Sequence, residues 1–383
     1  MKKYKIIIRG GYGLTNFGDD ALMYILIKKL MEHYHNEDIA LLCKSSSYIK
    51  KLIPSCTILD SRKNDIYAKT DIILYGGGTQ FYSFSGTSSK QRLLKYIINP
   101  SLFVKKLLLK IKRNSIPKII LYKEDIETKS TGAIGIGVGP FEGNNFTEEE
   151  TKKLFLKMDF IAVRDIYSIN KCKIWGLEKT QHFSDLCYLF DNKDLNISEQ
   201  NINSKVKSIG IIVRDWPHTD KGSAYYTKIE PLIHKLKNNG YNVNIIIFAK
   251  GRDSFWLERL KNVQNVIQWN PDKQTINEFI TTLNLFDLFI SARYHGAIFS
   301  ALLNKPFISI SVEQKLDMIS DIYVNASKKW QYPFNIEDCI NNVKFIDDNY
   351  HQFVKQVKLT NKEQQKLAHS MLNNFLEYSK KFN

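Results

Sequence analysis

The feature of this sequence that most limits its fold is a regular alternation of two kinds of segment. Short runs rich in Ile, Val, Leu and Phe alternate with longer stretches of helical periodicity. Strands that alternate with helices need crossover connections, which produce parallel sheets with helices on their faces. The alternation stops in the polar stretch Asp191–Lys205 and restarts at Ser208. We therefore expect two α/β units joined by a linker.

The individual elements follow from the same pattern. The expected strands are Lys5–Arg9, Asp38–Cys43, Asp71–Tyr75, Ala133–Val138, Phe160–Val163, Ser208–Val213, Val243–Phe248, Leu288–Ser291 and Phe307–Ser311. The expected helices are Asp19–His33, Ser46–Leu52, Thr147–Met158, Tyr225–Asn238, Thr275–Phe286, Gly296–Leu303 and Glu363–Tyr378. The last helix is amphipathic, and we expect it to pack back toward the N-terminal domain.

The length of the chain fits this organisation. A chain of 383 residues is too long for one core and suits two domains of ordinary size. We expect an α/β protein with two Rossmann-like domains that face a cleft. The expected boundaries are residues 1–190 for the N-terminal domain, 191–206 for the linker, 207–356 for the C-terminal domain and 357–383 for the final helix.

The composition narrows the class of protein. No segment approaches the roughly 18 uninterrupted apolar residues of a membrane span, and the apolar start Ile6–Ile8 is a strand rather than a signal peptide. The five cysteines lack C-x-x-C spacing, which favours reduced thiols in a cytoplasmic protein. The net charge of +16 reflects either a lysine-rich surface or an anionic substrate or membrane. No nucleic-acid-binding pattern accompanies it, so we expect no nucleic acid partner.

The segment Leu93–Arg113 differs from the rest of the chain. Its apolar residues interleave with lysines and one arginine, and it contains no acid. Such a segment can lie peripherally on the inner membrane face, with its lysines toward the headgroups. The alternative is an ordinary pair of surface helices broken at Pro100.

The first candidate site is the stretch G-G-Y-G-L-T-N-F-G-D-D-A-L-M at 10–23. Glycines after the first strand, Gly13 among them, let backbone N–H groups approach a ligand. The stretch is no clean G-x-G-x-x-G, and two acids at a helix start suit sugar hydroxyls better than phosphate. Asn16 and Asp20 are the expected ligand contacts, whereas Asp19 has a second interpretation as a helix cap.

Two further stretches have both a structural and a functional interpretation. Gly76-Gly77-Gly78 follows a buried strand and most simply marks a tight turn, although Gly77 and Gly78 also leave space for a substrate. Arg164-Asp165 with Ser168, and Ser184-Asp185 near the domain boundary, are structural pairs or parts of a site.

The C-terminal half carries the stronger candidates. Arg214 follows one expected strand, and Arg293-Tyr294-His295 follows another, directly before a helix. Residues after parallel strands gather at one edge of the sheet, and a helix amino terminus adds positive potential there. Two arginines and a histidine at this edge predict a site for a multiply charged anion. The other histidines lack metal-ligand spacing, so we expect no metal, and no G-x-S-x-G or Walker sequence occurs.

Taken together, these motifs resemble those of the polysaccharide pyruvyl transferase family. The resemblance covers most of the chain and rests on G-Y-G-L-T-N-F-G-D-D-A, G-G-G, G-V-G-P, V-R-D-I-Y-S, V-R-D-W and S-A-R-Y-H-G-A-I-F-S-A-L-L-N-K-P-F-I-S-I, in that order, with Lys315 after them. It implies a two-domain arrangement similar to that of GT-B glycosyltransferases. Members of the family move pyruvate from phosphoenolpyruvate onto two hydroxyls of a sugar, which forms a cyclic ketal on a bacterial surface glycan or its precursor.

The resemblance also implies roles for individual residues. The donor phosphoenolpyruvate would be held on the C-terminal side by Arg214, Arg293 and His295, and Tyr294 and Lys315 are further expected substrate contacts. The sugar acceptor, which can be lipid-linked, would meet the N-terminal side at Gly13, Asn16, Asp20, Gly77 and Gly78. Ketal formation needs a general acid and a general base, for which we hypothesise His295 and Asp20. No cofactor is implied.

Two other classes remain open. A GT-B glycosyltransferase with a nucleotide-sugar donor would also place basic groups on the second domain. A peripheral membrane or scaffold protein with a vestigial cleft would depend on the segment Leu93–Arg113. Stabilisation by phosphoenolpyruvate but not by uridine diphosphate separates the expected function from the first of these, and liposome binding without any donor effect identifies the second.

Overall fold

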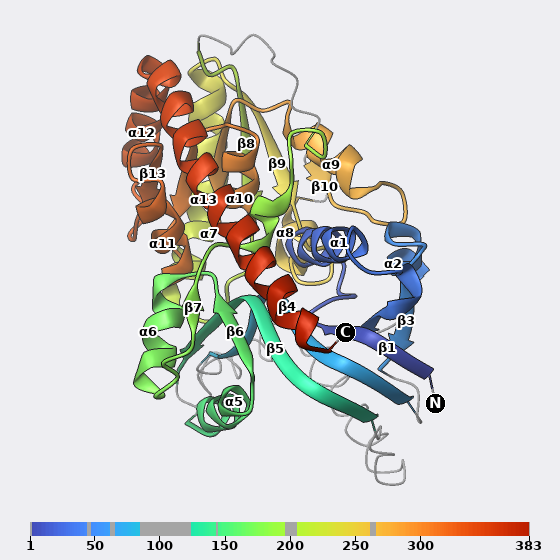
Figure 1. The fold of residues 1–383 in the computed structure, drawn as a ribbon. Coiled ribbons are helices and arrows are strands. Elements are labelled where there is room, and N and C mark those ends of the chain that lie inside the picture. The colour runs from blue at the N-terminus through green and yellow to red at the C-terminus, as the bar shows by residue number, and fades with distance from the viewer. Residues whose placement is uncertain are drawn as a thin grey trace, which may run out of the picture.

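Each half of the chain forms a parallel β-sheet with helices on both faces (Figure 1). The computed structural model describes residues 2–43, 47–61, 66–84, 124–142, 145–195, 205–260 and 266–382. Within these residues, no helix has both the length and the apolar character that crossing a membrane requires. The segment Leu93–Arg113 lies outside the described residues.

The first sheet has seven strands in the order β3-β2-β1-β4-β5-β6-β7. Its strands are β1 (Lys2–Arg9), β2 (Ile39–Cys43), β3 (Thr57–Asp60), β4 (Ile66–Ser83), β5 (Glu124–Phe141), β6 (Phe160–Val163) and β7 (Gln181–His182). The helices of this half are α1 (Phe17–Met31), η1 (Asn36–Asp38), α2 (Ser47–Leu52), α5 (Asn145–Leu156), α6 (Ile166–Ile174) and η2 (Leu186–Leu189).

The second sheet has six strands in the order β10-β9-β8-β11-β12-β13. Its strands are β8 (Ser208–Val213), β9 (Asn242–Ile247), β10 (Val266–Gln268), β11 (Leu288–Ser291), β12 (Phe307–Ile310) and β13 (Ser327–Trp330). The helices of this half are α7 (Asp220–Asn238), α8 (Ser254–Arg259), α9 (Ile276–Leu283), α10 (Tyr294–Leu302), α11 (Gln314–Ile322), α12 (Ile336–Asp348), α13 (Tyr350–Ser379) and η3 (Lys380–Phe382).

The predicted fold class is confirmed, because both halves are Rossmann-like. The turn expected at Gly76-Gly77-Gly78 is wrong, since these residues lie inside the long strand β4. Gly77 and Gly78 have φ values of 57° and 78°, which L side chains rarely adopt, and β4 nevertheless stays paired with β5 on both sides of them. Glycine at these two positions therefore lets β4 adopt this backbone without strain.

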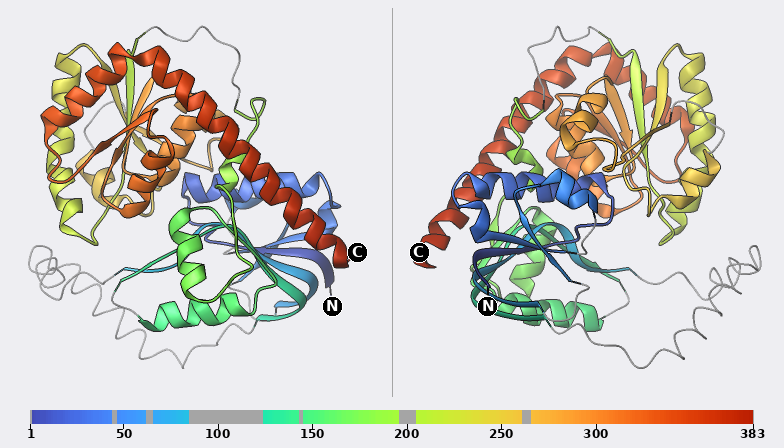
Figure 2. Two further views of the ribbon diagram at one scale, coloured as in Figure 1. Left: turned by 60° about the vertical axis from the view of Figure 1, so that its left-hand side comes forward. Right: turned by 90° about the vertical axis from the view of Figure 1, so that its right-hand side faces the viewer.

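The final helix joins the two domains. It is 30 residues long and begins at Tyr350, well before the expected start at Glu363. Its first turns contribute Phe353 and Val354 to the core of the second domain, and near its end Phe375 packs on Phe160 of β6. Figure 2 shows α13 running from one domain to the other, and the two chain ends lie near each other beside the first sheet.

A hydrophobic core continues from one domain into the other through α1. Phe17, at the start of this helix, is fully buried, and its backbone N–H donates to the carbonyl of Phe248 in the second domain (2.9 Å). Its ring lies 4.6–5.3 Å from the ring centres of four second-domain aromatic residues: Phe248, Trp269, Phe279 and Phe299. Burying a side chain of this size contributes roughly 1.5–3 kcal/mol. The domains are thus held together by apolar packing as well as by the chain.

The strand orders locate the place where a ligand should bind. In the first sheet the order reverses between β1 and β4, and in the second between β8 and β11. In open α/β sheets, ligands bind beyond the carboxyl ends of the strands at such a reversal. The residues that follow these strands line a single cavity.

Candidate functional site

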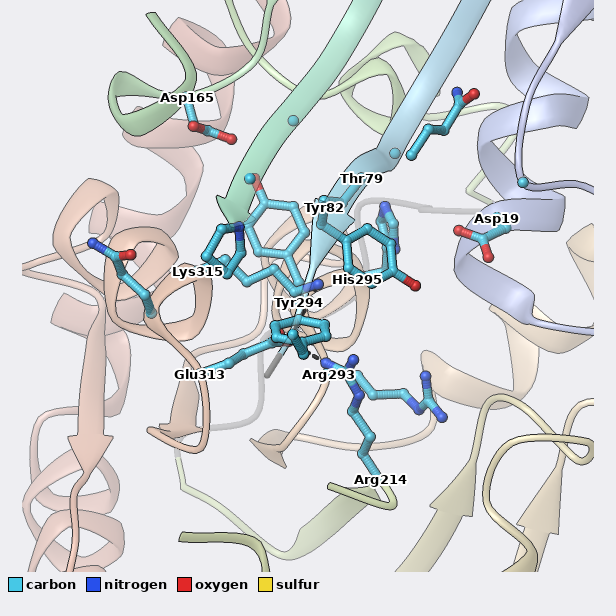
Figure 3. Close-up of a pocket in the computed structure, with 18 of the residues that line it drawn as sticks. Asp19, Thr79, Tyr82, Asp165, Arg214, Arg293, Tyr294, His295, Glu313 and Lys315 are labelled. Carbon is cyan, nitrogen blue, oxygen red and sulfur yellow. Dashed lines mark hydrogen bonds and ion pairs between the residues drawn. The ribbon is translucent and has the colours of Figure 1, made fainter. Parts of the chain in front are cut away.

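A cavity of about 590 Å³ lies between the two domains at the carboxyl ends of both sheets. Its N-terminal wall comes from the residues after β1, from the ends of β4 and β5, and from the residues after β6. Its C-terminal wall comes from the residues after β8, β9, β11 and β12. Figure 3 shows side chains of both walls pointing toward the same space.

The C-terminal wall brings together all the side chains predicted for the donor. Arg214 follows β8, Arg293 and His295 follow β11, and Lys315 follows β12. These three strands are neighbours in the sheet, so the side chains converge although they are about 100 residues apart in sequence. Tyr294 also lines the cavity, and its ring lies under the guanidinium of Arg164 at 4.5 Å.

Local hydrogen bonds place Arg293 at the start of α10. The hydroxyl of Ser291, at the end of β11, accepts from the N–H of Arg293 (3.1 Å) and donates to its carbonyl (2.8 Å). The arginine is 7% exposed, and its guanidinium donates to both carboxylate oxygens of the buried Asp253. Its Nε is buried and has no hydrogen-bond partner among the described residues. Buried unpaired donors are uncommon and concentrate at functional sites.

A second carboxylate organises the other two cations. Glu313 accepts a short hydrogen bond from Arg214, and its Oε1 lies 3.2 Å from Nζ of Lys315. Burial alone would raise the pKa of Glu313, but these two cations outweigh burial and lower it. Burial lowers the pKa of Lys315 to about 8, with Glu313 opposing the shift and Arg214 and Arg164 adding to it. Arg214 also lies over the ring of Trp216 at 4.5 Å.

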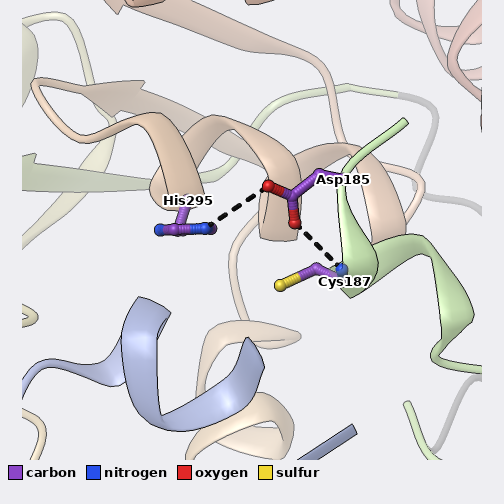
Figure 4. Close-up of side chains that lie close together, drawn as sticks. All are labelled: Asp185, Cys187 and His295. Carbon is purple, nitrogen blue, oxygen red and sulfur yellow. Dashed lines mark hydrogen bonds and ion pairs between the residues drawn. The ribbon is translucent and has the colours of Figure 1, made fainter. Parts of the chain in front are cut away.

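His295 lies where the two domains meet. An ideal Cβ on Gly18 would be only 2.3 Å from its Nδ1, so the imidazole occupies the space that a side chain at position 18 would need. Its Nε2 is buried and lies 3.7 Å from Oδ2 of Asp185, which belongs to the first domain (Figure 4). The side chain is 13% exposed and lines the cavity.

Asp185, Cys187 and His295 are the set of described side chains whose spacing could hold a metal ion (Figure 4). Two observations argue against a metal there. The guanidinium of Arg164 already donates to the Asp185 carboxylate at 2.7 Å and places a positive charge beside it. Burial and the charge of Asp185 raise the pKa of the Cys187 thiol well above its usual range, so the thiolate that binds metals is disfavoured. We therefore interpret Asp185 and Cys187 as residues that hold His295 in place, and not as metal ligands.

The N-terminal wall contains several of the residues predicted for the acceptor. Asn16, Gly77 and Gly78 line the cavity. The carboxylate that lines it is Asp19 rather than Asp20. The Oδ2 of Asp19 accepts from the amide of Asn16 (2.7 Å) and lies 3.9 Å from Arg252, while its Oδ1 faces the bare backbone of Gly78.

The structure does not bring Asp20 or Gly13 to the cavity. Asp20 is fully buried beneath it, where its Oδ1 accepts from the hydroxyl of Tyr48 (3.0 Å) and its Oδ2 from the indole of Trp269 (2.8 Å). Because adjacent residues of a helix point about 100° apart, only one of the two acids can face the cleft. Burial raises the pKa of Asp20 to about 7. Its position suits a contact between the domains, since Trp269 belongs to the second.

Three supporting residues were missed or only weakly indicated by the sequence. Asp253 and Glu313, the partners of the two arginines, carried no sequence signal that distinguished them from surface acids. Asp185 had a weak signal in S-D-L-C-Y-L-F, next to the domain boundary.

Known proteins with this architecture were found by structural comparison. A UDP-GlcNAc 2-epimerase from Neisseria meningitidis, bound to UDP-GlcNAc, shares 12% identity with a TM-score of 0.56, over 98% of this chain and 100% of that one. A putative UDP-N-acetylglucosamine 2-epimerase from Listeria monocytogenes shares 10% identity with a TM-score of 0.56, over 99% and 97%. A glycosyltransferase from Rickettsia africae shares 13% identity with a TM-score of 0.52, over 99% and 98%. At such identities the likeness concerns the fold alone.

Two facing Rossmann-like domains with a cleft at their strand ends define a GT-B-like protein. No curated protein matches the sequence. The family model described as polysaccharide pyruvyl transferase matches residues 16–314. The chain therefore belongs to the polysaccharide pyruvyl transferase family, whose members are transferases of polysaccharide biosynthesis.

Proposed function

We propose that the protein transfers pyruvate from phosphoenolpyruvate onto two hydroxyls of a sugar and forms a cyclic ketal. The observation that carries this proposal is the convergence of Arg214, Arg293, His295 and Lys315 on one wall of the cavity. Phosphoenolpyruvate carries a carboxylate and a phosphate, and planar guanidinium groups bind both kinds of anion with paired hydrogen bonds. Asp253 and Glu313 hold the arginines in place before the ligand arrives, which lowers the cost of binding.

His295 is the proposed general acid. Addition of its proton to C3 of phosphoenolpyruvate makes C2 an electrophile, to which the first sugar hydroxyl adds. Its side chain lines the cavity on the donor wall and is partly exposed, which suits this transfer. A well-placed acid or base contributes about 10²–10⁴-fold to the rate.

Asp19 replaces Asp20 as the proposed general base. It lines the cavity beside Gly77 and Gly78, and only its Oδ2 is engaged by described side chains. It takes the proton of the first hydroxyl and passes it to the departing phosphate. The second hydroxyl then adds to C2 and returns its proton to His295. The two hydroxyl protons thus end on the C3 methyl group, by way of His295, and on phosphate, and the enzyme is restored.

The donor can be identified by thermal-shift titration of the purified chain with phosphoenolpyruvate, inorganic phosphate and uridine diphosphate. A ligand at about 100 times its dissociation constant stabilises the fold by about 2.7 kcal/mol. We expect a shift with phosphoenolpyruvate that is clearly smaller in Lys315→Gln and unchanged in Lys237→Gln, an exposed lysine at the end of α7. A shift with uridine diphosphate alone would instead identify a nucleotide-sugar glycosyltransferase.

Lys315 is the better variant for this test than Arg293. Removing the arginine leaves the buried Asp253 without its partner, a change that costs about 3–5 kcal/mol in other proteins. Loss of binding in Arg293→Ala could then not be separated from loss of folding. Lys315 is a quarter exposed, and Glu313 keeps Arg214 as a partner without it.

A further inference from the structure

Asp185 connects the two domains at the proposed general acid. It lies directly before η2, in the first domain, and is 1% exposed. Its Oδ1 accepts from the N–H of Cys187 (2.9 Å), and its Oδ2 accepts from Arg164 (2.7 Å). The same Oδ2 lies 3.7 Å from Nε2 of His295, which is carried by α10 of the second domain. One buried carboxylate is therefore shared by an arginine of one domain and an imidazole of the other.

The arginine behind this carboxylate is fixed on several sides. Arg164 is 3% exposed, donates to the hydroxyl of Thr79 (2.7 Å) and stacks on the ring of Tyr294 (4.5 Å). Burial alone would raise the pKa of Asp185, but His295 and Arg164 outweigh burial and hold it below its ordinary range. Asp185 is consequently a rigid carboxylate that stays ionised at neutral pH.

An ionised carboxylate accepts hydrogen bonds and cannot donate them. The imidazole nitrogen that faces Asp185, Nε2, is therefore the one that carries a proton when the ring is neutral. Nδ1, on the side of Gly18, is then the nitrogen that can gain and lose a proton. Partners of this kind fix the tautomer of functional histidines in many enzymes.

We propose that Asp185, held by Arg164, is a positioning residue that keeps His295 as the Nε2–H tautomer and leaves Nδ1 as the nitrogen that exchanges its proton. Asp185 itself takes no proton in any step. Because Asp185 and His295 come from different domains, this arrangement is complete only when the domains are docked. The proposal rests on the proposed role of His295 in proton transfer.

Nitrogen NMR of the full-length chain labelled with ¹⁵N-histidine tests the proposal without any acceptor sugar. The His295 signals are assigned by their absence in His295→Gln. At about pH 9, where an ordinary imidazole is neutral, we expect wild-type His295 to carry its proton on Nε2. In Asp185→Asn we expect a mixture of tautomers, because the amide supplies only one oxygen for three donors. A neutral wild-type ring that is protonated on Nδ1, or is already a mixture, overturns the proposal.

A matched control separates this effect from general loss of structure. Asp194 is also a buried carboxylate, paired with Lys28 away from the cavity. Asp194→Asn should leave the His295 signals unchanged, and a change there as large as in Asp185→Asn counts against the proposal. If Asp185→Asn fails to fold, the tautomer of His295 in the wild-type protein alone decides whether the proposal holds. Binding of phosphoenolpyruvate is measured separately, so the proposed donor and the proposed tautomer can fail independently.

Discussion

The imidazole of His295 lies directly against the backbone of Gly18, so close that a methyl group at position 18 would be 2.3 Å from Nδ1. The two residues belong to different domains. Gly18 lies in the first turn of α1, so its backbone is helical and does not need a glycine for a loop or turn. We expect Gly18→Ala to displace the ring from its place. Turnover should fall by at least tenfold, while the thermal shift with phosphoenolpyruvate is largely kept, because Arg214, Arg293 and Lys315 line the cavity and Gly18 does not.

The matched substitution is Ala21→Gly, which changes a buried position of the same helix that does not line the cavity. It should lower stability by about 1 kcal/mol through helix propensity, more if its methyl packing is lost, and leave turnover per folded molecule near wild type. If Gly18→Ala retained full turnover, the close contact between residue 18 and His295 would not be needed for activity.

Asp19→Asn tests the proposed base. The amide preserves the shape of the side chain and its contact with Asn16 but cannot accept the hydroxyl proton. We expect turnover to fall by about 10²–10⁴-fold with little change in phosphoenolpyruvate affinity, measured as phosphate release with an acceptor identified by screening. Asp338→Asn, an exposed acid in the first turn of α12, controls for the lost helix-dipole interaction. Equal losses in both variants would remove Asp19 from the mechanism.

Affinity for phosphoenolpyruvate should decline in alkaline solution because of Lys315. Its pKa is lowered to about 8, so the ammonium form, which attracts the anion, is lost progressively above that pH. We expect the dissociation constant to rise severalfold between about pH 7.5 and 9, by less than tenfold per pH unit for one proton. In Lys315→Gln, affinity for phosphoenolpyruvate should be lower at neutral pH. The part of the alkaline decline that is due to Lys315 should be absent in this variant. A decline of the same size in the variant would assign it to another group.

The buried Asp20 predicts a different dependence on pH, that of stability. Burial raises its pKa to about 7 in the folded chain, above the value of about 3.9 in an unfolded one. The folded state therefore binds the extra proton, and this contribution is fully present below about pH 4 and is lost as the pH rises through 7. Asp20→Asn should remove a decline in the free energy of unfolding of up to about 1.4 kcal/mol per pH unit over this range. Denaturant titrations of wild type and Asp20→Asn from pH 5 to 8 measure this decline. If the free energy of unfolding depends on pH in the same way in both proteins, the prediction is wrong.

The sequence predicted the buried strands most accurately. Phe160–Val163, Ser208–Val213 and Leu288–Ser291 are strands with the expected bounds, because each is a short apolar run with polar or small residues on both sides. Short elements such as β7 and β10 were missed, since two or three residues carry no measurable period. The early start of α13 was missed because its first turns are buried against the second domain by tertiary contacts.

The site was predicted on one wall better than on the other. The donor candidates follow parallel strands, so their sequence positions determine the edge at which they gather. The choice between Asp19 and Asp20 depends on a partner, Trp269, that is 249 residues away from Asp20, and no local pattern contains that information. The partners Asp253 and Glu313 were unpredictable for the same reason.

The packing of Phe17 among second-domain aromatic rings also affects how the chain folds as it is synthesised. Phe299, one of its neighbours, lies 282 positions further along the chain (299 − 17) and therefore leaves the ribosome later than Phe17. At about 5–20 residues per second, the delay is roughly 15–55 s, during which the outer face of α1 is uncovered. Until the second half is made, Phe17 lacks the aromatic neighbours that bury it in the folded protein. The helix α13 follows every strand of both sheets in the sequence, so the element that connects the two halves is synthesised after the sheets it joins.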